Sequence, residues 1–109
     1  MKNTLFFNAG LFISLLLPGA AQADEYVLQI KDNQFSPATL TIPADQKVRV
    51  IVRNLDPTPA EFESFDLRRE KVISGGSEAV VFIGPLKPGN YTFFDEFHAD
   101  TAKGTIIVK

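Results

Sequence analysis

The stretch "KVRVIVRN", residues 47–54, decides the fold class of this chain. Valine stands at every second position from Val48 to Val52, and lysine or arginine occupies most of the positions beside them. This period of two is the pattern of a β-strand with one face on a hydrophobic core and one face in water. Ile51 interrupts the charged side, which predicts partial burial on that face too.

Seven further runs have extended character and are separated by turns rich in Gly, Pro, Asn and Asp. They cover residues 26–30, 39–42, 60–67, 68–73, 78–83, 90–94 and 104–109. Beyond residue 23, no segment of helical length has a period of 3.6. Strands at roughly 8–12 residue spacing predict an all-β protein, an antiparallel β-sandwich of seven to eight strands.

The first 23 residues have the pattern of a secretory signal peptide. Lys2 precedes an apolar run at residues 11–17, and an A-x-A cleavage pattern ends at Ala23. The apolar run is too short for a permanent membrane anchor. We therefore expect a signal peptide at 1–23 and a single domain at 24–109, because removing 23 of the 109 residues leaves 86, enough for one domain.

The composition excludes several kinds of site. There is no Cys, so zinc–thiolate, disulfide-exchange and type 1 blue-copper centres are excluded. Without Lys2 the 11 basic residues become 10 against 13 acidic residues, a net charge of −3. The absence of a basic stripe predicts no nucleic-acid partner, whereas mild acidity fits a cation ligand.

Carboxylates and one imidazole remain as candidate metal ligands. Glu61 and Glu63 are two positions apart, so on a strand they share a face while Phe62 points into the core between them. Glu96 and His98, the only histidine, are likewise two apart. The remaining two candidates are Glu70 and Asp95. If the loop after residue 94 closes near residues 59–64, these groups converge on a site suited to iron, Cu(II), Mn or Zn.

Other interpretations of the same residues stay open. Glu61 and Glu63 could form the solvent face of an edge strand, where charges discourage pairing with another sheet. His98 could be an ordinary polar loop residue. Arg68 and Arg69 could either balance the carboxylates or form a solvated charge cluster of their own.

The C-terminal stretch "PGNYTFFDEFHADTAKGTIIVK", residues 88–109, resembles the end of a cupredoxin, whose pattern is roughly G-x-Y-x-F-x-C-x-x-H followed by a Gly-led strand. The matching residues are Gly89, Tyr91, Phe93, His98 and Gly104. Asp95 stands at the position of the copper-binding Cys. The resemblance implies a cupredoxin-like Greek-key sandwich.

The upstream stretch "NLDPTPAEF", residues 54–62, resembles the cupredoxin segment N-x-D-x-x-x-H-x-F. Asn54, Asp56 and Phe62 match, but Ala60 replaces the histidine ligand, with Glu61 next to it. His98 is then the only blue-copper ligand present.

As a set, "PAEFES" (59–64), "EKVISGG" (70–76), "IGPLKPG" (83–89) and "EFHADTAKG" (96–104) resemble the periplasmic cupredoxin-like proteins of bacterial iron-uptake systems, related to EfeO-type proteins. The resemblance implies iron or copper bound by acidic residues, a periplasmic iron-binding partner and an inner-membrane iron permease. Its metal ligands would be Glu61, Glu63, Glu70, Glu96 and His98. Asp95 is added to them because it occupies the Cys position.

Four hypotheses follow. The leading one is a periplasmic metal-binding protein for iron acquisition. The others are participation in copper-dependent oxidation of ferrous iron, copper storage or delivery, and a metal-free interaction module that uses the glutamates as surface charge.

Overall fold

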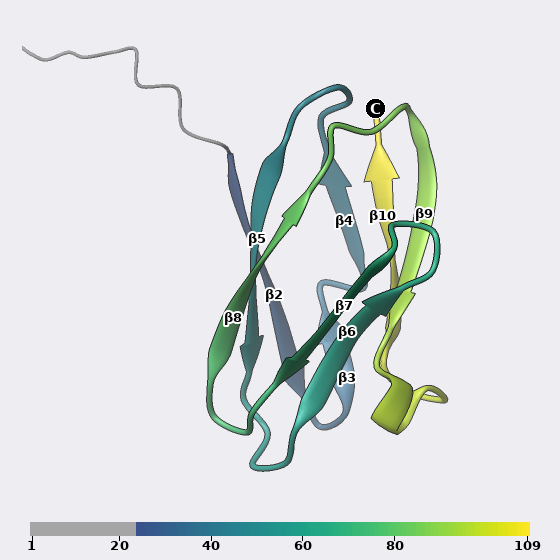
Figure 1. Cartoon of the computed structure of the whole chain (residues 1–109). Helices are drawn as coiled ribbons and strands as arrows, with labels where there is room; N and C mark the ends of the chain where they lie inside the picture. The colour runs from purple at the N-terminus through teal and green to yellow at the C-terminus, as the bar shows by residue number, and fades with distance from the viewer. Residues whose placement is uncertain (1–23) are drawn as a thin grey trace, which may run out of the picture.

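The computed structural model describes residues 24–109, so the predicted signal peptide lies outside the described residues. Two sheets face each other as a sandwich, one in the order β4-β10-β9-β6-β7 and one in the order β3-β2-β5-β8 (Figure 1). The strands are β2 (Glu25–Lys31), β3 (Gln34–Ser36), β4 (Thr39–Ile42), β5 (Val48–Asn54), β6 (Ala60–Ser64), β7 (Arg69–Ile73), β8 (Glu78–Ile83), β9 (Gly89–Phe94) and β10 (Lys103–Val108). A single turn of 3₁₀-helix, η1 (Glu96–His98), stands between β9 and β10. Within 24–109 no helix is long and apolar enough to cross a membrane.

The predicted all-β sandwich is confirmed, with three differences in detail. Two neighbouring pairs, β2 with β5 and β4 with β10, run parallel, while the other pairs are antiparallel. The additional strand β3 has three residues, too few for an alternating pattern. The extended run expected at 60–67 ends at Ser64, because the Ser64 hydroxyl accepts the Leu67 N–H and Arg68 takes a positive φ of 54°.

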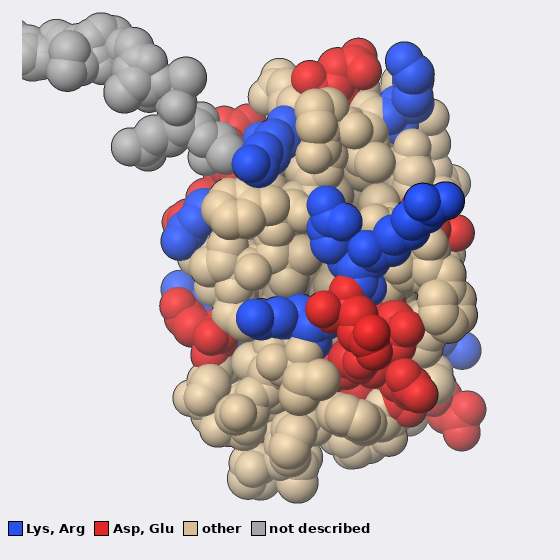
Figure 2. Space-filling model, viewed as in Figure 1, with Lys and Arg blue, Asp and Glu red and all other residues tan. Residues whose placement is uncertain are grey.

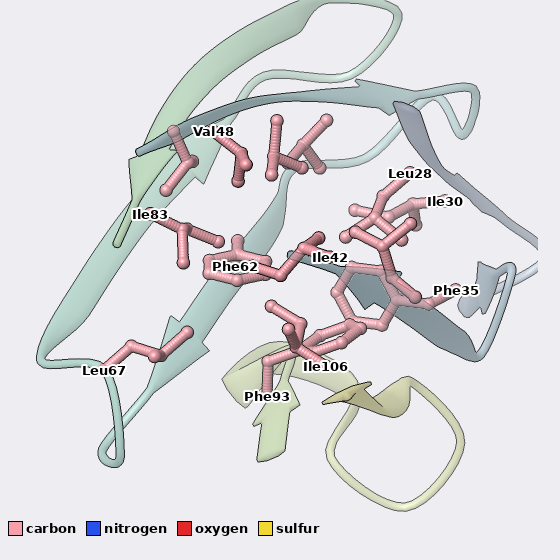
Figure 3. Packing of buried hydrophobic residues seen from close by; sticks show 14 of the residues in the cluster. Leu28, Ile30, Phe35, Ile42, Val48, Phe62, Leu67, Ile83, Phe93 and Ile106 are labelled. Carbon is pink, nitrogen blue, oxygen red and sulfur yellow. The ribbon is translucent and has the colours of Figure 1, made fainter. Parts of the chain in front are cut away.

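The core lies between the sheets and follows the predicted alternation. Val48, Val50 and Val52 of β5 are fully buried. Figure 3 shows Phe62 of β6 and Phe93 of β9 in the same core as Phe35 of β3. The ring centroids of Phe62 and Phe93 are 5.1 Å apart, and those of Phe35 and Phe93 are 4.8 Å apart. These rings form an aromatic base beneath the part of β6 that carries Glu61 and Glu63.

Asn54 and Asp56, two of the residues that match the cupredoxin pattern, connect three loops. The Asn54 side-chain amide donates to the carbonyl oxygens of Thr58 and Ile73, and its Oδ1 accepts the N–H of Asp56. The Asp56 carboxylate accepts the N–H groups of residues 32 and 33, at the turn between β2 and β3. Asn54 is 1% exposed, so its polar groups depend on these partners.

Candidate metal centre

Four glutamates from three elements meet at one place. Glu61 and Glu63 lie on β6, Glu70 lies on β7, and Glu96 is the first residue of η1. One carboxylate oxygen from each lies within 4.8 Å of those of the others. Figure 2 shows the largest group of acidic side chains on this face over the place where Figure 1 draws β6, β7 and the turn that follows β9. We call these four residues the carboxylate quartet.

Strand geometry brings the quartet together. Glu61 and Glu63 share the outer face of β6 and Phe62 is fully buried between them, as predicted. Glu70 stands opposite Glu63 in the antiparallel pair of β6 and β7, so the two side chains share that face. β6 meets β9 at the pair Glu63–Phe94, so the chain that leaves β9 passes beside β6 and η1 packs against it.

Burial makes Glu61 the unusual member of the quartet. It is 2% exposed, and its Oε1 has no hydrogen-bond partner in residues 24–109; the same holds for Oε1 of the partly buried Glu63. Burial, and next the neighbouring carboxyl groups led by Glu70, raise the pKa of Glu61 to about 8. Burial and the nearby carboxyl groups of Glu96 and Glu70 likewise raise the pKa of Glu63. A buried carboxylate without a partner is costly, so the site favours either protons or a cation.

Basic side chains border the quartet without neutralising it. Arg68 and Arg69 line a shallow hollow with Glu63 and Glu70. The Arg69 guanidinium donates instead to backbone carbonyl groups, including that of Phe82 at 3.1 Å. In the part of the chain that the structure describes, no salt bridge involves a quartet residue. The excess negative charge of the quartet is therefore left for a ligand.

Asp95 and His98, the other two predicted ligands, lie beside the quartet and are not among its four members. Asp95 is fully buried, and its Oδ1 accepts the N–H groups of Glu61 (3.1 Å) and Phe97 (2.9 Å). Its Oδ2 is 3.1 Å from Nδ1 of His98, whose side chain is 30% exposed. The structure thus brings together four of the six predicted ligands and joins the other two to each other.

Several apolar side chains near the quartet are exposed, and the sequence alone does not identify them as surface residues. Phe65, in the turn after β6, is 75% exposed and packs edge-on against Phe94, with the ring centroids 5.3 Å apart. Val72 of β7 and Phe97 of η1 are also about half exposed. An aromatic residue in an extended run is ordinarily predicted to lie in the core. Phe65 is exposed because β6 ends at Ser64 and the chain turns there.

The profile of the Cupredoxin-like domain family matches residues 4–108. An uncharacterized protein of Rickettsia prowazekii (strain Madrid E) is 45% identical over 84 residues, which cover 77% of this chain and 67% of that protein. The name of this relative describes no function, so the match indicates only that the two proteins are related.

Two solved structures have a similar fold. The metal binding domain of the Cu(I) exporting P-type ATPase CopA from Streptococcus pneumoniae, with Cu(I), gives a TM-score of 0.69 at 16% identity, covering 78% of this chain and 84% of that one. Auracyanin A, a blue copper protein from Chloroflexus aurantiacus, also gives 0.69, at 12% identity, covering 81% of this chain and 100% of that one. Identities this low show a shared sandwich, and the metal site must be argued from this chain's own residues.

Proposed function

Since the chain belongs to the cupredoxin-like domain family, we propose that it is a periplasmic metal-binding protein that acts in iron acquisition. The observation that carries the proposal is the buried Glu61. Among residues 24–109, its Oε1 has no hydrogen-bond partner, and no salt bridge offsets the three carboxyl groups beside it. A bound cation would give this oxygen a partner and would offset the repulsion among the four carboxyl groups. The periplasmic location rests on the signal-peptide pattern of residues 1–23.

The donor chemistry favours a hard cation. Four carboxylates supply only oxygen ligands, and ionised carboxylates stabilise Fe(III) more than Fe(II) because the smaller, more highly charged ion gains more from negative oxygen donors. Glu61, Glu63, Glu70 and Glu96 are the proposed ligands. Iron is the cargo here, and the resemblance to iron-uptake proteins supports its passage between a periplasmic iron-binding partner and an inner-membrane permease.

Copper binding is the second candidate function, and His98 is the observation that favours it. Imidazole suits Cu(II), and a ligating histidine usually has its other ring nitrogen bonded to a carboxylate, as Nδ1 of His98 is to Asp95. If both metals bind, one electron can pass from Fe(II) to Cu(II), giving Fe(III) and Cu(I). Ferrous oxidation that requires added Cu(II) would distinguish this activity from storage of either metal.

Titration of the metal-free domain, residues 24–109, tests the proposal. Fe(II) under anaerobic conditions, Mn(II) and Cu(II) are added separately, and calorimetry gives the stoichiometry while thermal unfolding gives the stabilisation. A metal at 100 times its dissociation constant should stabilise the fold by about 2.7 kcal/mol. In a domain of this size that is roughly 10–20 °C in melting temperature.

The control is Glu78, a glutamate that also lies on a β-strand but is not a member of the quartet. Glu61→Gln should abolish the stabilisation, whereas Glu78→Gln, which changes an exposed carboxylate paired with Arg53, should leave it intact. Absence of a shift with all three metals in the wild-type protein would overturn the proposal and favour the interaction module.

A further inference from the structure

Both carboxylate oxygens of Asp95 already have hydrogen-bond partners within the protein. It precedes η1, and its Oδ1 accepts the Phe97 N–H, which caps that turn. The same oxygen accepts the N–H of Glu61, 34 residues earlier in the chain. One atom therefore connects the turn that carries Glu96 to the strand that carries Glu61.

The second oxygen of Asp95 influences which ring nitrogen of His98 carries the hydrogen. Oδ2 lies 3.1 Å from Nδ1 of His98. Because an ionised carboxylate can only accept hydrogen bonds, this contact favours the tautomer that carries the hydrogen on Nδ1. In the neutral ring, Nε2 then carries the free lone pair. Among residues 24–109, Nε2 has no hydrogen-bond partner, and the partly exposed ring makes that lone pair available to a ligand.

Direct binding of a metal by Asp95 would compete with this arrangement. The side chain is fully buried, and two backbone N–H groups and Nδ1 of His98 already lie within hydrogen-bond distance of its two oxygens. Turning the carboxylate toward an ion would leave those buried donors unpaired, which is costly.

We infer that Asp95 is a positioning residue that holds Glu96 against Glu61 and fixes His98 in the Nδ1–H tautomer, so that Nε2 serves as a nitrogen ligand for Cu(II). The inference rests on the proposed function for its metal. It assigns different ligands to the two metals: oxygen atoms of the carboxylate quartet suffice for iron or Mn(II), whereas Cu(II) binds through the imidazole. Asp95 then influences copper affinity without touching the ion.

The tautomer can be measured without any metal. Long-range ¹⁵N–¹H correlation NMR of the metal-free domain in alkaline buffer should show the Nδ1–H form of His98. In Asp95→Asn the two backbone N–H groups keep the amide oxygen at the Oδ1 position. The amide NH₂ then faces Nδ1 and should switch the ring to Nε2–H. The matched control is Asp66→Asn, since Asp66 also accepts a backbone N–H, that of Thr92, and does not contact His98.

Cu(II) binding gives the second readout. The electron paramagnetic resonance spectrum of the wild type and of Asp66→Asn should show nitrogen coupling, and Asp95→Asn should lose it with a 10- to 100-fold drop in Cu(II) affinity, about the usual effect of a second-layer change. The stoichiometry with Mn(II) should stay unchanged. An Nε2–H tautomer in the wild type, or unchanged nitrogen coupling in a folded Asp95→Asn variant, would overturn the inference. A wild type that binds no metal would overturn the proposed function, while the tautomer measurement, which needs no variant, would still test the role of Asp95.

Discussion

Glu61→Gln should make the metal-free protein more stable at alkaline pH while abolishing its response to metal. The pKa of Glu61 is raised from 4.5 to about 8. Between those values the folded protein holds a proton on Glu61 that the unfolded chain has released, so the free energy of unfolding falls as pH rises. This contribution is fully present below about pH 4.5 and is lost as pH passes about 8. At about 1.36 kcal/mol per pH unit, the shift from 4.5 to about 8 makes this loss on the order of 5 kcal/mol.

The assay is urea unfolding in the presence of a chelator, at about pH 5 and about pH 8.5. Glutamine keeps the size of the side chain and carries no proton to release, so the variant should have the flatter pH profile and should exceed the wild type in stability at the higher pH. Glu78→Gln, at an exposed site, should follow the wild-type profile. A wild-type stability that does not fall over this range, or a Glu61→Gln variant less stable than the wild type at about pH 8.5, would refute the reasoning.

Three further outcomes follow from the structure. Metal affinity should rise with pH up to about 8, because the ion must displace the proton of Glu61; calorimetry in buffers of different ionisation enthalpy should detect the released proton, and a pH-independent affinity would contradict it. Asn54→Ala should lower the free energy of unfolding in urea by about 2–3 kcal/mol, since the carbonyl groups of Thr58 and Ile73 lose their donor, while metal stoichiometry stays unchanged. Phe62→Ala should cost about 3–5 kcal/mol in the same assay and weaken metal binding, because the cavity loosens the strand between Glu61 and Glu63; an unchanged affinity would show that the aromatic base does not position the ligands.

The strands were predictable where the alternation was long enough to be unambiguous. Val48 to Val52 determine which face of β5 is buried, because side chains on a strand alternate strictly. Strand β3 was missed since three residues carry no period, and the end of β6 at Ser64 depends on a hydroxyl that accepts a backbone N–H three residues later. The parallel pairing of β2 with β5 was not predictable, because no short stretch of sequence indicates which distant strand lies beside it.

The sequence by itself determined that any metal ligands would be oxygen or imidazole, since the chain has no cysteine, and that Glu61 and Glu63 would share a face on either side of a buried Phe62. The tertiary structure alone decided what surrounds them. The pairing of β6 with β7 places Glu70 beside Glu63, and the packing of η1 on β6 places Glu96 beside both strands. The Asp95 carboxylate accepts the N–H of Glu61 from a distant part of the chain. Periodicity determines the direction of a side chain within its own strand, but burial, charge repulsion and hydrogen-bond partners depend on which distant segments are packed against it.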